Sequence, residues 1–185
     1  MYFMLGCFGP EDQNRAALGE VRGLKDVYWT TGRRFSSPIP TPVEVFLDPW
    51  YPGVMVPMFD RGILLFSDAM IAALQEAGVD NLDCYPAVIK DTVKGITYKD
   101  YKAVNIIGII ACADLGKSKH TAFGDPLIDV DFDSLAIDEA KTRDALMFRL
   151  AECVSGIVVH EKVKEHLEAK GIAYLDFTPP GEWVG

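Results

Sequence analysis

The 185-residue chain has no long hydrophobic run, and this absence limits where it can work. A helix needs roughly 20 consecutive apolar residues to span a bilayer, and no stretch of the sequence approaches that length. The first residues, MYFMLGCFGPEDQN, are apolar only briefly and carry no Lys or Arg, so they do not have the form of a secretory signal. We therefore expect a cytoplasmic protein that has no membrane partner.

Recognisable catalytic and metal-binding motifs are also missing. The four cysteines and three histidines show neither CxxC nor zinc spacing, and the motifs HExxH and GxSxG are absent. The segment ADLGKSKH contains GKS but lacks the upstream glycine of a phosphate-binding loop. We therefore expect no catalytic residue, no metal site and no cofactor. The alternative is a small, hydrolase-like enzyme whose site, for example Cys153, His160 and Asp176, is assembled only in space.

What the sequence does contain is one pattern written twice. Residues 64–86, LLFSDAMIAALQEAGVDNLDCYP, align without a gap on residues 157–179, IVVHEKVKEHLEAKGIAYLDFTP, at an offset of 93. Each copy has an apolar strand, a polar helix start, an amphipathic helix, a glycine stop and a second strand. Internal duplication and convergence both explain the match. The identical pairs are Leu74/Leu167, Gly78/Gly171, Leu82/Leu175, Asp83/Asp176 and Pro86/Pro179.

Strand signals outnumber helix signals along the chain. Residues 1–60 hold short strand-like and Pro-rich segments, and we interpret them as an N-terminal segment of the same domain as the core formed by residues 61–185. The apolar run AVNIIGIIACADL predicts a central strand, and LMFRLAEC predicts another. We therefore predict an α+β fold: a mixed, mostly antiparallel sheet with the helices of two strand–helix–strand units packed on it.

Negative charge is concentrated in one short window. The net charge is −9, and residues 120–140 hold six carboxylates without a Lys or an Arg. Here Val130 and Phe132 alternate with aspartates, which predicts a strand with one apolar and one carboxylate face, then a bulge near Ser134. A calcium loop is the alternative, but its glycine position is Ser134 and its final position is Ala140. The carboxylates that we expect to contact a partner are Asp125, Asp129, Asp131, Asp133, Asp138 and Glu139.

Several polar residues lie in apolar strands or at their ends, among them Arg149 and Glu152. Buried charges are normally paired. We therefore expect Arg149 to form an ion pair with a carboxylate that fixes the sheet; a functional role for Arg149 is the alternative.

A wider pattern connects these segments. A helix ends in GVDNLDCYP, an Asn-containing apolar strand leads to ADLGKS, and FRLAE precedes the closing strand–helix–glycine unit. From Arg61 to Phe177 the chain thereby resembles the myxobacterial-type immunity protein family of bacterial polymorphic toxin systems. We expect the residues that carry this resemblance to be mainly structural. They are Gly78, Val79, Asn81, Tyr85, Pro86, Asn105, Asp114, Ser118, Phe148, Arg149, Leu150, Glu152 and Gly171.

The resemblance implies a cytoplasmic antitoxin, not an enzyme, that binds a cognate toxin protein and blocks it stoichiometrically. An acidic chain repels nucleic acid and suits a basic toxin surface, because complementary charge speeds association and improves specificity. Aromatic side chains are the usual anchors of such interfaces. The candidates here are Trp29, Trp50, Tyr51 and Trp183. A homodimer formed through an edge strand is also compatible with the sequence.

Overall fold

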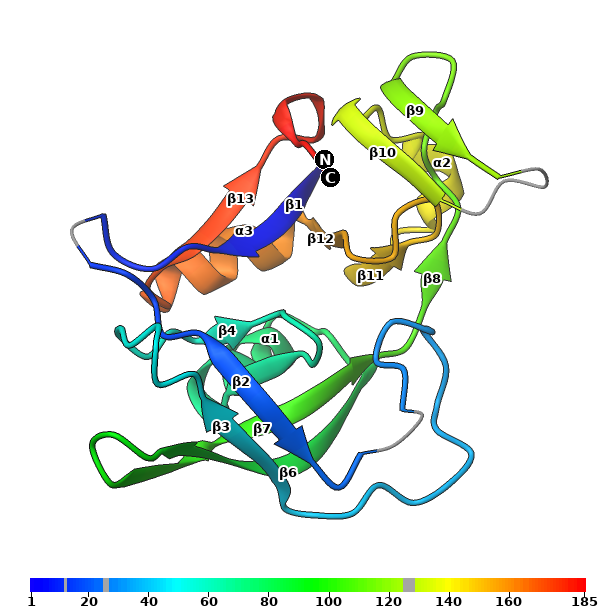
Figure 1. Cartoon of the computed structure of the whole chain (residues 1–185). Coiled ribbons are helices and arrows are strands. Elements are labelled where there is room, and N and C mark those ends of the chain that lie inside the picture. Colours follow the sequence, from blue (N-terminus) through cyan, green and yellow to red (C-terminus); the bar gives the residue numbers. More distant parts are fainter. Residues whose placement is uncertain (12, 25–26, 125–128) are drawn as a thin grey trace.

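The computed structural model describes residues 1–11, 13–24, 27–124 and 129–185. Within these ranges the chain forms a six-stranded sheet, a five-stranded sheet and a two-stranded hairpin, and a helix packs on each large sheet (Figure 1). The predicted α+β fold is therefore confirmed, and most neighbouring strands are antiparallel as expected. The strands, however, are divided between separate sheets.

Both large sheets combine strands from distant parts of the chain. The six-stranded sheet has the order β2-β3-β6-β7-β5-β4, with β2 (Leu18–Arg22), β3 (Val43–Leu47), β4 (Met58–Phe59), β5 (Leu65–Ser67), β6 (Leu82–Asp91) and β7 (Ile96–Ile106). The five-stranded sheet has the order β13-β1-β12-β11-β8, with β1 (Tyr2–Cys7), β8 (Ile109–Ile110), β11 (Met147–Leu150), β12 (Ile157–His160) and β13 (Leu175–Thr178). The hairpin is formed by β9 (Lys119–Phe123) and β10 (Asp129–Ser134). The helices are α1 (Asp68–Glu76), α2 (Glu139–Thr142), α3 (Glu161–Ala169) and the 3-10 turn η1 (Pro180–Glu182).

The N-terminal segment, residues 1–60, contributes to both large sheets. Its first strand, β1, lies between β12 and β13, whereas β2, β3 and β4 belong to the six-stranded sheet. β3 runs parallel to β6, and their pairing begins at Ala87, directly after Pro86. A proline has no N–H to donate, and Pro86 lies just before the residues of β6 that pair with β3.

The two copies of the repeated pattern have the same order of elements, and their helices have equivalent bounds. α1 is capped by Ser67, whose Oγ accepts from the backbone N–H of Met70 at 3.2 Å. At the equivalent position of α3, the Nδ1 of His160 accepts from the backbone N–H of Lys162 at 3.1 Å. Each helix is then followed by a glycine with positive φ, +98° at Gly78 and +66° at Gly171, a conformation that glycine adopts readily. The predicted strand–helix–strand units are therefore confirmed.

In both units the two strands are parallel but not adjacent, because one antiparallel strand lies between them. β7 separates β5 from β6, and β1 separates β12 from β13. The registers also agree: the cap residue Ser67 pairs with Tyr101 of β7, and the cap residue His160 pairs with Tyr2 of β1. Each unit is thus a split strand–helix–strand motif with a tyrosine at the same point of the inserted strand.

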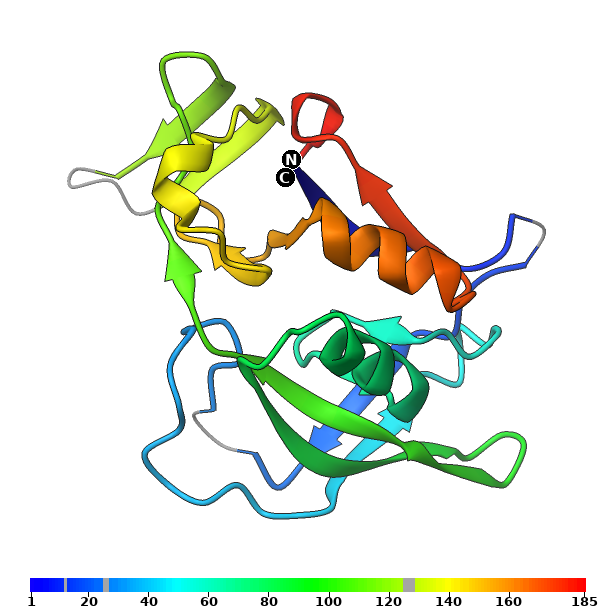
Figure 2. The same cartoon turned by 180° about the vertical axis from the view of Figure 1, so that it is seen from behind.

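The second unit matches the first only if the ends of the chain are joined. In the first unit the inserted strand β7 follows β6 directly, whereas in the second the inserted strand β1 is the beginning of the chain and β13 is near its end. The N- and C-termini lie side by side in both views (Figures 1 and 2). Even the preceding hairpin strands correspond, since the Met-Phe pair of β4 and the Met-Phe pair of β11 have equivalent registers. The repeat is therefore circularly permuted in the fold.

The five-stranded sheet is buried on both faces, and this places the β9–β10 hairpin. On one face, Leu5 and Val159 join the main core with α1 and α3, which lie side by side in Figure 2. On the other face, Met4 and Val158 pack with Phe132 of β10 in a second core. The hairpin therefore covers one face of this sheet with its apolar side and presents its other side outward.

The prediction of one central strand for AVNIIGIIACADL is only partly right. β7 ends at Ile106 in the six-stranded sheet, and β8, Ile109–Ile110, belongs to the five-stranded sheet. Gly108, with φ +131°, stands between them and lets the chain cross from one sheet to the other. The apolar run continues across Gly108 into β8, so hydrophobicity alone does not reveal the break. Among the described residues, no helix has the length and apolar character that crossing a membrane requires.

Candidate functional site

The carboxylate face predicted for residues 129–134 is present on β10. Val130 and Phe132 are buried, whereas Asp129, Asp131 and Asp133 are exposed, as the period of two requires. The predicted bulge is also confirmed, since the register of β10 against β9 shifts between Phe132 and Ser134. One short strand thus carries three carboxylates in a row on the outward side of the hairpin.

These three aspartates have no cationic partner among the described residues. By contrast, Asp114 and Asp138 each pair with a lysine three residues later, at 2.8 and 3.6 Å. Unpaired, solvated carboxylates at this spacing repel one another and gain from a cation that approaches from outside. The row is therefore a surface suited to a basic partner.

The other predicted contact residues have partners within the molecule or lie outside the described part. The carboxylate of Asp138 caps α2 by accepting from the N–H of Ala140 at 3.2 Å. Glu139 pairs with the N-terminal ammonium group of Met1 at 3.4 Å. Asp125 lies outside the described residues. The structure thus leaves three of the six predicted carboxylates on one common face.

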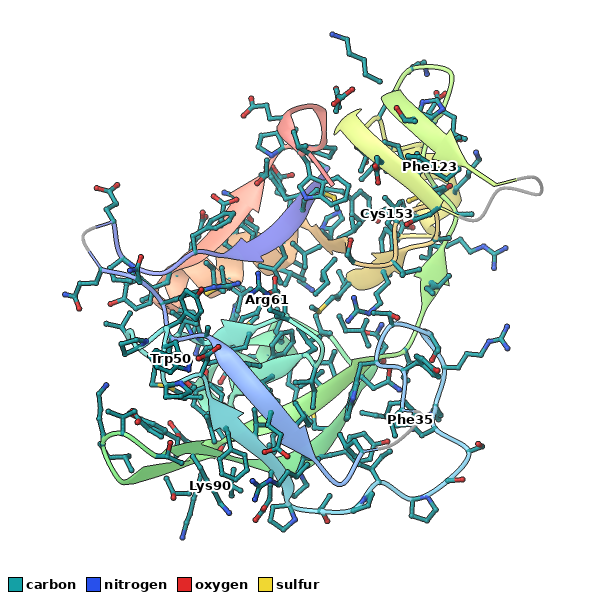
Figure 3. All side chains as sticks on the ribbon, viewed as in Figure 1. Phe35, Trp50, Arg61, Lys90, Phe123 and Cys153 are labelled. Atoms are coloured by element: carbon teal, nitrogen blue, oxygen red, sulfur yellow. The ribbon has the colours of Figure 1, made fainter. Side chains whose placement is uncertain are left out.

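A second exposed surface is a groove of about 780 Å³ lined by residues 8, 10, 11, 13–18, 50–52 and 59–61. Three of its aromatic side chains are largely in solvent: Phe8 is 72% exposed, Trp50 85% and Tyr51 66%. Arg15 and Asp60, 3.2 Å apart, form an ion pair in its wall. Trp50 and Arg61 both line this groove, and both are labelled in Figure 3. Aromatic side chains gathered at the surface in this way commonly mark a protein-binding region.

The candidate aromatic anchors divide into two groups. Trp50 and Tyr51 line the groove, whereas Trp29 is buried and makes edge-to-face contacts with Phe35 and Tyr85. Trp183 is half-buried against Phe132, where it closes the second core. Sequence reasoning missed Phe8, although its position after a strand and directly before the Gly-Pro turn was an available signal for exposure.

The residues that carry the family resemblance mostly hold the fold together. Asn81 links the two large sheets, since its Nδ2 donates to the carbonyls of Ile107 at 2.7 Å and Met147 at 2.9 Å. Asn105 is fully buried and donates to the carbonyl of Arg33 at 2.7 Å. The Oγ of Ser118 donates to the carbonyl of its motif neighbour Asp114 at 2.8 Å and thereby closes a turn. The ring of Tyr85 packs on Trp29 and Phe35, and Phe148 is a core residue next to Tyr2.

The predicted ion pair of Arg149 with a carboxylate is wrong for the described residues. The Arg149 guanidinium instead donates to the backbone carbonyl of Val154 at 2.8 Å, within the connection from β11 to β12. Burial lowers the pKa of Arg149 to about 10, and the charge of Asp60 opposes this shift. Glu152 is likewise turned to the backbone, since its Oε1 accepts from the N–H of Ala113 at 3.2 Å. Each side chain therefore has one backbone partner, while the Nε of Arg149 and the Oε2 of Glu152 are buried without a hydrogen-bond partner among the described residues.

Cys153 and His160 of the alternative enzyme site have other hydrogen-bond partners in the structure, and His160 and Asp176 are apart on the two strands that flank β1. The Sγ of Cys153 is 3.1 Å from the Oγ of Ser155, and the Nδ1 of His160 is used in capping α3. By register, His160 and Asp176 stand opposite residues 2 and 6 of β1, about 13 Å apart along the strand. Burial raises the pKa of Cys112 to about 12, so that thiol is protonated at neutral pH. In the described ranges, no three His, Cys, Asp or Glu side chains are grouped to hold a metal ion.

Comparisons with known proteins add no relative. No protein-family model matches the chain, and a search of curated proteins finds no match to it.

Proposed function

We propose that this protein is a cytoplasmic immunity protein that neutralises a cognate bacterial toxin by binding it stoichiometrically, and that the toxin presents a basic surface. The observation that carries the proposal is the row Asp129, Asp131 and Asp133, which is exposed and has no cationic partner among the described residues. Complementary charge accelerates the encounter of two proteins and improves its specificity. The resemblance of residues 61–177 to an immunity protein family agrees with this role.

The aromatic groove supports the same class of function. Binding energy in protein interfaces is concentrated in a few aromatic and arginine side chains. Trp50 and Tyr51 are exposed beside Phe8 on one groove. A specific protein interface usually buries about 1,200–2,000 Å² of surface in total, so the groove would form only part of it. The acidic row then provides steering, and the groove provides apolar contact.

Growth rescue tests the proposal. The protein encoded beside this gene is expressed in a sensitive host with and without the present chain, and complex formation is checked by pull-down. We expect killing that the chain abolishes, together with a complex of equal stoichiometry. Killing that persists in its presence contradicts the immunity role.

Charge reversal then tests the acidic row. The variant Asp129→Lys/Asp131→Lys/Asp133→Lys is expected to bind the toxin about tenfold or more weakly at low ionic strength, because it replaces attraction by repulsion. The matched control Asp80→Lys/Asp100→Lys/Glu165→Lys changes the net charge equally, at exposed residues without ion pairs among the described ones, and is expected to bind almost normally. Equal loss in both variants would mean that net charge, and not this face, attracts the toxin.

A further inference from the structure

The inner edge of β10 is occupied by the end of the chain. Phe132 exchanges both of its backbone hydrogen bonds with Gly185, and the N–H of Val130 donates to the carbonyl of Glu152 at 2.9 Å. The backbone groups of these two β10 residues therefore point away from β9. In an antiparallel pair, opposed residues either exchange hydrogen bonds or both face outward. The β9 residues opposite Phe132 and Val130 must accordingly face outward as well.

Those β9 residues are His120 and Ala122, which pair in register with Phe132 and Val130. Their N–H and C=O groups are directed to the outer edge of β9, where no further strand pairs in the described part of the chain. β9 is the outermost strand of this hairpin in Figure 1. An uncovered edge of this kind is a template for an added strand.

The side chains beside this edge give it a chemical preference. By register, Thr121 lies next to Asp131, and Phe123 lies next to Asp129, on the outward face of the hairpin. Thr121 is exposed and Phe123 is 48% exposed; Figure 3 shows Phe123 on this hairpin. A strand added to β9 would lie about 5 Å from it and about 10 Å from the aspartate row. That distance is close to the screening length of about 8 Å at physiological ionic strength.

We propose that an extended basic segment of the partner protein adds to β9 as the third strand of this hairpin. Its Lys or Arg residues occupy the alternate positions that lie beside Thr121 and Phe123 on the outward face. Its backbone pairs with His120 and Ala122, and its cations face the row of three aspartates. The exposed ring of Phe123 offers an additional cation–π contact. This inference rests on the proposed function, because the toxin is the partner that would supply the segment.

A second copy of the chain fits the edge less well. Pairing β9 with the β9 of another molecule would place two aspartate rows in one continuous sheet, and each chain already carries a net charge of −9. Like charges brought into one sheet oppose association. Charge complementarity therefore favours a basic segment as the occupant.

Ala122 provides a variant that tests the edge without changing charge. Its N–H is not used in the β9–β10 ladder, so Ala122→Pro removes an outward donor but no ladder hydrogen bond, and it places a ring against any added strand. Ala122→Val keeps the N–H and is the matched control. The probe is a blocked heptapeptide in which arginine alternates with valine and threonine, and its N-methylated form loses strand hydrogen bonds while it keeps all charges.

Peptide binding to the full chain is measured by fluorescence anisotropy. We expect the wild-type protein and Ala122→Val to bind equally, and Ala122→Pro to bind about tenfold more weakly. The N-methylated peptide should lose a similar factor on the wild-type protein. Equal binding of both peptides would overturn strand addition, because charge alone would then account for the affinity. A concentration-dependent wild-type dimer that Ala122→Pro abolishes would also overturn the proposal, since a second copy would be the occupant.

Growth rescue with the same variants separates this inference from the proposed function. Rescue by the wild-type protein but not by Ala122→Pro supports strand addition to β9. Equal rescue by both overturns strand addition and leaves the immunity role standing. If the wild-type protein fails to rescue while peptide binding still depends on Ala122, the immunity role fails and the basic-strand site stands.

Discussion

The two strand–helix–strand units share their geometry but not their surroundings. Both helices bury the same two positions: Met70 and Leu74 in α1 correspond to Val163 and Leu167 in α3, at the common offset of 93. α1 also buries Ile71 and Ala73, whereas Lys164 and His166 occupy those positions in α3 and reach solvent. The two positions that both helices bury are therefore common to the motif. Whether the other two positions are buried depends on the neighbours of each helix outside the motif.

Truncation of the shared position should have the largest effect. Leu74→Ala and Leu167→Ala each remove a fully buried side chain and are expected to lower the free energy of unfolding by about 2–5 kcal/mol. Urea unfolding monitored by circular dichroism measures both, with the exposed Glu165→Ala as the control. A loss below about 1 kcal/mol for only one of them would show that the two helices are not anchored equivalently.

Substituting the glycines that end the helices should reveal a smaller difference in stability between the two units. Both have positive φ, so an added Cβ is expected to cost about 1–2 kcal/mol at either position. A Cβ at Gly78 would also approach the Cδ1 of Leu146 to 3.3 Å, whereas at Gly171 it meets nothing within 4 Å. Gly78→Ala should therefore destabilise more than Gly171→Ala in the same unfolding assay.

Asparagine provides the check on that comparison. Because Asn tolerates the left-handed conformation, Gly171→Asn should recover part of the loss seen with alanine. If Gly171→Ala is the more damaging of the two alanine variants, contact with Leu146 does not decide the difference.

The ionic link between the helices should have a smaller, pH-dependent effect. The carboxylate of Glu76 in α1 accepts from Lys170 and lies 3.4 Å from the Nε2 of His166. The hydrogen bond and charge of Lys170 lower the pKa of Glu76, with a smaller contribution from His166. A lowered folded-state pKa stabilises the protein above the ordinary carboxyl pKa, and this contribution is lost as the pH falls through the folded value.

The variant Glu76→Gln removes that contribution. We expect the stability of the wild-type protein to fall more steeply than that of Glu76→Gln from about pH 5 downward, in urea unfolding measured at a series of pH values. Glu165→Gln, an exposed residue of α3 without an ion pair among the described residues, should follow the wild type. Parallel curves for the wild type and Glu76→Gln would show that the link does not contribute.

The smallest effect on stability is expected at the candidate contact face. Asp131 is exposed and has no cationic partner in the described part of the chain, so Asp131→Asn should change the free energy of unfolding by less than about 0.5 kcal/mol. The same variant should weaken binding of a basic partner. A large loss of stability would indicate that the aspartate row serves the fold.

Local signals were enough to place much of the fold and part of the candidate site. Ser67, Gly78 and Gly171 delimit the helices because caps and glycine stops act within a few residues. The alternation around Val130 and Phe132 predicted the acidic strand for the same reason. The partners of Arg149 were not predictable, because a short-range pattern carries no information on which backbone carbonyl approaches from another turn.

The sequence by itself determined the two units, their caps and the acidic face of β10, since each follows from contacts between residues close along the chain. Only the tertiary structure decided that β1 is inserted between β12 and β13, as β7 is between β5 and β6. Strand pairing over such separations is made by backbone hydrogen bonds that nearly every residue type can form, so the side-chain pattern of one strand does not identify its distant partner. The outer edge of β9 became a candidate site for the same reason: the end of the chain at Gly185 occupies the opposite edge of the hairpin and leaves this one open.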